Sequence, residues 1–477
     1  AEFSFEIEGP PHDREQRSRL ALPGRRNTWN ASRLTVASRS FALTSSSCLL
    51  IPATPLGLTF SEATANYVLA LIGAGMLCLP KNLADAGGVG GLVLLVMSHT
   101  CVTECSLQID RAIAHAELLS GRRGSIGTYE DIAGEALGSK GQLVLLLLKN
   151  TYWLGVLVVF TLFVTDSTVG ILSEVSSLSA MSPDEVRWFV VYPVFLLGSM
   201  VRDLRALAPL QPVAIAATFL MCGSLVLASA CEFFRPGFAL DVSRFEGSAS
   251  DLGTATATSI FACGAIVSMV PAVRSQMAQP ERCPSAIRTS MAIVWGIHAA
   301  VMCSGYAAYG TKLGATILET VGNDCQPIQC KLAMASSIGV NLKLCLTVPS
   351  FVFLVTSVFE SLGDLRIHTP LSFPNVLCRI SLMTALFLLG MVLPHVREII
   401  GLLSASIGIT LALLLPLCIC YAMRRRCALG SPACARDLFV HTVVVTMCLC
   451  VGYYGITGNW EKLSKKMQME MQMAGME

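Results

Sequence analysis

The chain has 477 residues, of which 53% are hydrophobic and only 14% are charged. A soluble domain would carry roughly 25% charged residues, and the deficit here lies in long apolar runs joined by short polar loops. This pattern excludes a soluble globular protein and predicts an all-α, multi-pass membrane protein. The net charge of +2, without a basic stripe interleaved with aromatic residues, argues against a nucleic-acid partner.

Residues 1–60 are rich in Arg, Ser and Pro, which predicts a disordered basic tail in the cytosol. A transit peptide would also be rich in Arg and Ser, but the acidic residues of this stretch argue against one. They are Glu6, Glu8, Asp13 and Glu15. The membrane domain then occupies residues 61–457, and residues 458–477 are expected to form a short exoplasmic tail.

Eleven membrane spans are predicted, since a helix needs about 20 apolar residues to cross a bilayer. They lie near residues 61–86, 88–112, 142–173, 187–204, 208–232, 253–277, 286–309, 332–360, 375–394, 397–423 and 437–457. Lys and Arg gather in alternate loops, which places the amino terminus in the cytosol and the carboxyl terminus outside. These loops contain Arg122, Arg123, Arg202, Arg205, Arg282, Arg288, Arg424, Arg425 and Arg426.

The first span contains the sequence Ile72-Gly73-Ala74-Gly75-Met76, and Pro80 follows it. Two glycines one residue apart and a proline shortly after them are poor material for a continuous helix. In lipid, a broken backbone persists only where protein or a water-filled cavity satisfies the freed amide and carbonyl groups. We therefore predict a discontinuous first helix, a feature that small-solute transporters use to hold their substrate.

Eleven spans fit two halves of five helices plus one appended helix, so that the sixth span opens the second half. This span has small residues at its middle, Ala262, Cys263 and Gly264, and then Pro271. Paired interruptions at matching positions of two halves indicate a binding site at the membrane midplane. The sixth helix is therefore also predicted to be discontinuous.

These motifs resemble those of the amino acid/auxin permease family, over residues 61–457. The strongest element is Gly73-x-Gly75-x-Leu77-x-Leu79-Pro80, followed by Ala86-Gly87. Further matches, in chain order, are Tyr129-Glu130-Asp131, Arg202-Asp203-Leu204-Arg205-x-Leu207, Phe261-Ala262 with Pro271, Gln276-Met277, Pro280, Gly305-Tyr306-x-x-Tyr309-Gly310, Leu346-Thr347-Val348-Pro349 and Pro394. The resemblance implies a LeuT-like 5+5 inverted repeat and secondary active transport of amino acids.

Ile72, Gly73, Ala74, Gly75 and Met76 are the candidate binding residues of span one. A break here would expose backbone amides at the positive end of a half-helix, which suits the carboxylate of an amino acid. Close helix packing through small residues is the alternative explanation of the glycines.

In span six, the backbone carbonyls around Ala262, Cys263 and Gly264 are the candidates for the α-ammonium group of the substrate. The small side chains leave room, and Phe261 would form a wall of the pocket. The alternative is that Phe261 is an ordinary core residue.

The resemblance favours protons as the coupling ion, with sodium as the alternative. Sodium-coupled relatives commonly have an asparagine four residues before the first glycine. Here that position is Leu69, and Asn66 lies about one turn earlier. Thr347 of span eight offers a hydroxyl to a sodium ion, but Ala265-Ile266 and Gln276-Met277 resemble the proton-coupled branch.

Lys343 lies 12 residues after Lys331, roughly 18 Å along a helix and therefore near the middle of the bilayer. It shares a helix face with Thr347. An ionisable residue at this depth is a functional hypothesis by default. In one hypothesis, its amine takes the place of sodium and couples transport to protons. In the other, it snorkels to an interface or pairs with Glu104 or Asp166.

Other polar residues are assigned structural roles. Lys149 and Asp166 are predicted to anchor the two ends of span three at the interfaces. Cys325 and Cys330 share an exoplasmic loop and can pair with each other or with Cys231.

No metal or cofactor site is predicted, because Cys427 and Cys434 have no CxxC partner or nearby histidine. The sequence contains no HExxH, GxSxG or P-loop motif, so an enzyme is not expected. The sequon at Asn30 lies in the predicted cytosolic tail and should stay unmodified. We expect a monomer in the plasma membrane or an acidic organelle, and a nutrient-sensing receptor with the same fold is the alternative class.

Overall fold

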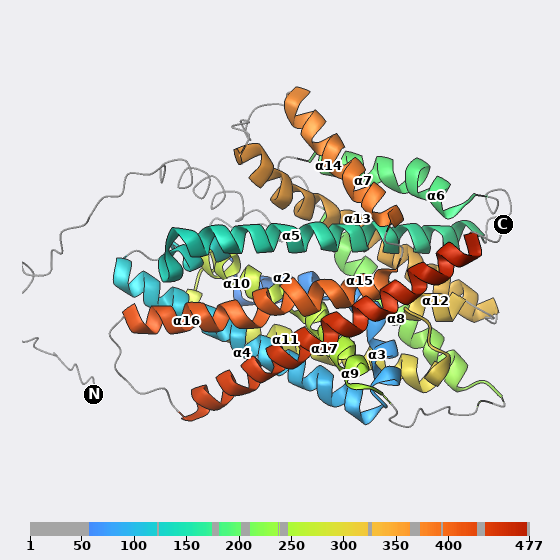
Figure 1. The fold of residues 1–477 in the computed structure, drawn as a ribbon, viewed down its shortest axis with the longest axis horizontal. Helices are drawn as coiled ribbons and strands as arrows, with labels where there is room; N and C mark the ends of the chain where they lie inside the picture. Colours follow the sequence, from blue (N-terminus) through green and yellow to red (C-terminus); the bar gives the residue numbers. More distant parts are fainter. Residues whose placement is uncertain are drawn as a thin grey trace, which may run out of the picture.

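The computed structural model describes residues 57–121, 124–173, 181–201, 210–236, 238, 247–322, 327–362, 373–392, 395–426 and 435–474. Long helices lie side by side along the longest axis of the molecule (Figure 1). In these ranges, nine helices are long and apolar enough to cross a membrane, and a bent pair provides a tenth. The protein is therefore an all-α, integral multi-pass membrane protein.

The first part of the bent pair is α2 (Phe60–Leu71), and the second part combines the 3₁₀ helix η2 (Ala74–Cys78) with α3 (Leu79–Asp85). The other spans are formed by α4 (Val89–Ser120), α5 (Tyr129–Ser173), α8 (Gln211–Phe233), α9 (Ala249–Cys263) with α10 (Ala265–Gln276), α11 (Cys283–Tyr309), α13 (Pro327–Leu362), α14 (Phe373–Val392), α15 (Val396–Leu403) with α16 (Leu415–Arg426), and α17 (Ala435–Ala474). Between α15 and α16 the helix continues through two π-helical segments, η7 (Ser404–Gly408) and η8 (Thr410–Leu414).

The fourth predicted span is the exception. It corresponds to α6 (Pro183–Val186), a π-helical turn (Arg187–Val191) and α7 (Tyr192–Ser199), a run too short to count as a span by itself. In Figure 1 these segments lie beside α14 at one edge of the bundle, where the Tyr192 and Phe387 rings are in contact. The total of eleven spans therefore stays a prediction.

The predicted break in span one is confirmed. A capping box between Thr59 and Glu62 starts α2, which ends at Leu71. Gly73 then takes extended dihedral angles, and the two parts of the span are bent by 50°. The irregular backbone lies among buried residues, as the bilayer requires.

The predicted break in span six is reduced to a local irregularity, and the prediction of an unwound helix is wrong here. Gly264 separates α9 from α10 but keeps right-handed helical dihedral angles, φ −69° and ψ −22°. Its amide still donates to the Ile260 carbonyl at 2.6 Å. The two helices consequently form one continuous candidate span from Ala249 to Gln276.

The last helix extends beyond its predicted span, since α17 continues to Ala474. Outside the span it is held by two ion pairs, from Lys462 to Asp251 (2.6 Å) and from Lys466 to Glu398 (2.8 Å). These contacts join α17 to the starts of α9 and α15.

Candidate functional site

The break in span one leaves three backbone amides at the start of η2. The amide of Ile72 still donates to the Val68 carbonyl at 3.1 Å, as in a helix. The next amide bonded within the span is that of Met76, which donates to the Gly73 carbonyl. Within the described residues, the amides of Gly73, Ala74 and Gly75 have no hydrogen-bond partner. Unpaired amides at a helix start form a ready site for an anion.

The two glycines of the break have different surroundings. A Cβ atom at Gly75 would lie 2.8 Å from Phe261 Cδ1 and 2.9 Å from Ala262 Cα. A Cβ atom at Gly73 would meet nothing within 4 Å. Gly75 is therefore needed for close packing between spans one and six, whereas Gly73 borders open space.

The break also frees a carbonyl that Lys343 uses. In a continuous helix, the Leu69 carbonyl would accept a hydrogen bond from the Gly73 amide. Here it accepts one from Lys343 Nζ at 2.7 Å. The Lys343 side chain is only 4% exposed and comes from α13, so this bond joins span eight to span one.

The alternatives for Lys343 do not match its contacts. Its burial excludes snorkelling to an interface. Glu104 is paired with Arg111 at 3.1 Å, and no bond joins Lys343 to Asp166 in the described structure.

The two other candidates for ion coupling, Asn66 and Thr347, lie in α2 and α13, and Cys222 of α8 also contacts the break. Asn66 is fully buried in α2, about one turn before Leu69. The Thr347 hydroxyl donates to the Lys343 carbonyl of its own helix at 2.7 Å. The Cys222 thiol, from α8, contacts Met76 Sδ at 3.9 Å.

A family model for "Transmembrane amino acid transporter protein" matches residues 57–458. The chain belongs to this family. It is 22% identical over 410 residues to amino acid transporter AVT1D of Arabidopsis thaliana, covering 84% of this chain and 70% of that one. It is 23% identical over 374 residues to AVT1J of the same plant, covering 76% of this chain and 82% of the relative.

A shorter match, 24% identical over 271 residues, joins the chain to vacuolar amino acid transporter 3 of Schizosaccharomyces pombe, covering 56% and 38% of the two chains. Among solved structures, MhsT in complex with L-phenylalanine is similar with a TM-score of 0.44 and 14% identity, covering 84% of this chain and 99% of that one.

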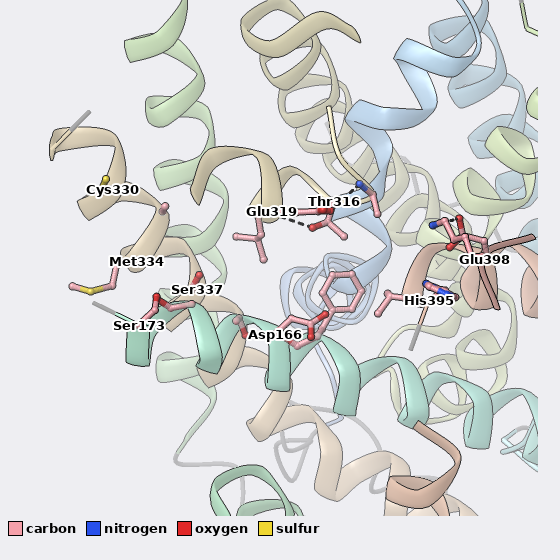
Figure 2. Close-up of a pocket in the computed structure, with 17 residues that line it drawn as sticks. Asp166, Ser173, Thr316, Glu319, Cys330, Met334, Ser337, His395 and Glu398 are labelled. Atoms are coloured by element: carbon pink, nitrogen blue, oxygen red, sulfur yellow. Dashed lines mark hydrogen bonds and ion pairs between the residues drawn. The ribbon is translucent and has the colours of Figure 1, made fainter. Parts of the chain in front are cut away.

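In this amino acid transporter family member, a cavity of about 570 Å³ opens at the ends of α5, α12 (Ile317–Gly322), α13 and α15. We call it the vestibule. Figure 2 shows Asp166, Glu319, His395 and Glu398 around it, and Lys466 of α17 also lines it. All these ends belong to the face predicted to be exoplasmic. Ser337 in its wall precedes Lys343 by six residues, or about 9 Å along the helix.

The opposite end of span one is packed against span six. Leu58 forms a single parallel bridge with Met277, in which the Leu58 amide donates to the Gln276 carbonyl at 2.7 Å. Beside it, Arg274 of α10 binds Asp110 (2.7 Å) and Glu117 (3.2 Å) of α4. The Lys343 contact is therefore flanked by an open vestibule on one face and packed helix ends on the other.

The two predicted interfacial anchors of span three have different positions. Lys149 is 7% exposed and forms a buried ion pair with Glu130, so it does not reach an interface. Asp166 is exposed, but it faces the vestibule. The prediction for Lys149 is wrong, because Glu130 in the first turn of α5 pairs with it inside the protein. The role of Asp166 as an interfacial anchor stays a prediction.

Sequence analysis missed several buried polar residues. Arg397 at the start of α15 binds Asp85 of span one at 2.5 Å. Arg379 of α14 donates to the Ser199 and Val201 carbonyls at the end of α7. Both arginines lie in or beside an apolar run, the same signal that singled out Lys343, although Arg397 is followed directly by Glu398.

Among the cysteines, Cys330 is disulfide-bonded and Cys231 carries a free thiol. Cys325 lies outside the described residues, as do Asn30, Arg122, Arg123, Arg202, Arg205, Pro394, Cys427 and Cys434.

Proposed function

We propose that the protein is a secondary active transporter that moves amino acids by alternating access, with protons coupled through Lys343. The observation that carries this proposal is the bond from Lys343 Nζ to the Leu69 carbonyl, at the point where span one is broken. A cation at this point ties span eight to span one. A change in its charge therefore acts directly on the helix that holds the substrate.

In this mechanism, the protonation state of Lys343 determines how strongly its side chain binds the Leu69 carbonyl. A buried ammonium without an acidic partner is costly unless its donors are satisfied, and the Leu69 carbonyl satisfies one of them. Protonated Lys343 favours the state in which this carbonyl faces it, and loss of the proton weakens the tie. The Thr347 hydroxyl donates to a carbonyl of its own helix. In this proposal, the amine of Lys343 takes the role that a sodium ion has in sodium-coupled transporters.

The substrate carboxylate is assigned to the amides of Gly73 and Ala74, because the space beside Gly73 is open. The α-ammonium group is assigned to the carbonyls of Ala262, Cys263 and Gly264. Since span six is helical here, this part of the site forms only when the turn at Gly264 opens. Substrate binding is therefore coupled to the opening of span six at Gly264.

The proposal includes eleven spans in a 5+5 inverted repeat with one added helix. Ser173, at the end of α5, and Cys330 of α13 both line the vestibule. The end of α8 is at the same face, because Glu232 accepts a bond from Gln329 of α13 at 2.7 Å. The chain therefore has to cross back between residues 173 and 211, which favours α6–α7 as the fourth span.

We place the transporter in the membrane of an acidic organelle, with the amino terminus in the cytosol. The positive-inside pattern supports the orientation. The word "vacuolar" in the name of the fission yeast relative supports the compartment. The vestibule would then face the acidic lumen.

Uptake into proteoliposomes tests the proposal. Purified protein is supplied with a panel of radiolabelled amino acids, with and without a pH gradient and with and without sodium. We expect saturable uptake of at least one amino acid that follows the pH gradient and ignores sodium. In Lys343→Met, we expect the pH dependence to disappear, whereas Lys343→Arg should bind substrate but stay permanently charged.

Strict sodium dependence in the wild type would overturn the coupling proposal. So would an unchanged pH dependence in Lys343→Met with uptake retained. Saturable binding without flux, under every gradient, would favour a nutrient-sensing receptor instead.

A further inference from the structure

A second cavity lies between α4, α11 and α17, and no residue of the span-one break lines it. We call it the lateral groove. Its volume is about 520 Å³, and its apolar lining includes Val96, Leu107, Met291, Trp295 and Phe439. Val96, Trp295 and Phe439 are also among the exposed apolar residues. All three helices are long and apolar enough to span the membrane, so the groove opens to the lipids of the bilayer.

The polar groups of α4 in the groove are already satisfied. The Thr100 and Thr103 hydroxyls donate to carbonyls four residues earlier in the same helix, at 2.7 and 2.6 Å. Both ring nitrogens of His99 are bonded, one to the Leu95 carbonyl at 3.0 Å and one to His298 at 3.2 Å. This wall therefore offers methyl groups and ring faces rather than free donors.

Arg288 is the exception. It lies near the start of α11, lines the groove and is exposed. Glu104, the acid of the same groove, is paired with Arg111. In the part of the chain that the structure describes, Arg288 has neither an acidic nor a carbonyl partner. A guanidinium group has five donors in a planar fork that matches a phosphate.

We propose that the lateral groove binds an anionic phospholipid from the leaflet at the predicted cytosolic face. Its acyl chain lies against Val96, Leu107 and Trp295, and its phosphate binds Arg288. Two features of the groove specify this ligand together: an apolar volume at membrane depth and one unpaired cation at the end where headgroups lie. The assignment does not depend on which solute the protein carries.

Trp295 provides a local reporter. The full-length protein is reconstituted in phosphatidylcholine bilayers that contain a fixed fraction of lipid with brominated acyl chains, either phosphatidylglycerol or phosphatidylcholine. The Trp295 signal is the difference between the wild type and Trp295→Phe. We expect brominated phosphatidylglycerol to quench it at about fivefold lower mole fraction than brominated phosphatidylcholine, the preference that one arginine near a membrane surface provides.

Two variants test whether Arg288 causes the preference for phosphatidylglycerol. Arg288→Gln should remove it, and Arg282→Gln should keep it, because Arg282 is exposed nearby but does not line the groove. Mass spectrometry of co-purified lipid provides a second measurement without tryptophan substitution. Arg288→Gln should retain several-fold less anionic phospholipid than Arg282→Gln.

Equal quenching by the two lipids in the wild type would overturn the proposal and leave only non-specific lipid contact. A preference that survives Arg288→Gln would also overturn it. Because both measurements report lipid binding rather than flux, their outcome is separate from that of the transport proposal.

Discussion

Replacing the glycines at the span-one break one at a time separates packing from substrate binding. In Gly75→Ala, the new methyl group would lie 2.8 Å from Phe261 Cδ1 and 2.9 Å from Ala262 Cα. Carbon atoms in contact prefer about 3.5–4.0 Å, so spans one and six have to move apart. The Phe261 ring can tilt, but Ala262 Cα belongs to the backbone. Overpacking of this kind costs about 1–3 kcal/mol.

Gly73→Ala is the matched control. Its methyl group would meet nothing within 4 Å, and φ of −159° is extended backbone that alanine adopts freely. The free energy of unfolding should therefore stay within about 0.5 kcal/mol of the wild type. The methyl group would stand beside the amides that we assign to the substrate carboxylate. We therefore expect a raised KM for uptake with unchanged stability.

Reversible unfolding in mixed detergent micelles measures the free energy of unfolding, and concentration-dependent uptake into proteoliposomes measures the KM. Gly75→Ala should lose stability, and the added change Phe261→Leu should recover only part of it. Wild-type stability in Gly75→Ala would show that spans one and six are not in tight contact. Wild-type uptake by Gly73→Ala would refute the carboxylate assignment.

Three further changes test buried ion contacts. Lys149→Met should cost about 3–5 kcal/mol, because it leaves Glu130 buried without its partner, and the double change with Glu130→Gln should cost less in the same unfolding assay. Asp85→Asn should weaken the ion pair with Arg397. We expect it to raise the labelling of a cysteine placed at position 73 by a thiol reagent added from the vestibule side. Unchanged labelling would mean that this ion pair does not restrict access of the reagent to the break in span one. Arg379→Met should destabilise by about 1.5–3 kcal/mol, the value of hydrogen bonds made by a charged group, and wild-type stability would contradict that role.

The sequence predicted the break in span one because Gly73, Gly75 and Pro80 leave little choice of backbone. Lipid cannot form hydrogen bonds with the unpaired amide and carbonyl groups of a broken helix, so the break also had to be buried in protein. In span six, Ala262, Cys263 and Gly264 permit a break without forcing one. Glycine also adopts helical dihedral angles, and the Gly264 amide keeps its bond to Ile260. Small residues alone therefore could not predict the state of this helix.

The contacts between residues of different helices could not be predicted from the sequence. The position of Lys343 in its span predicted its depth, but depth does not identify Leu69 as the residue that it contacts. Lys149 lies near the end of its predicted span, and only the fold shows that Glu130 covers it. The predicted fourth span is short and contains Pro193, and its helix includes a π-helical turn at Arg187–Val191.

The broken helix and the buried lysine account for each other. A break at Gly73 leaves the Leu69 carbonyl without its helical donor, and an unpaired carbonyl in hydrocarbon costs several kcal/mol, by the order of magnitude for such groups. A lysine amine at the same depth needs acceptors for its protons, and no acid of the described residues pairs with Lys343. The 2.7 Å bond between them meets both needs at once. The two features therefore stabilise each other. In the transport mechanism that we propose, a movement that re-forms the helix at Gly73 makes its amide compete with Lys343 for the Leu69 carbonyl, and loss of a proton from Lys343 weakens this contact.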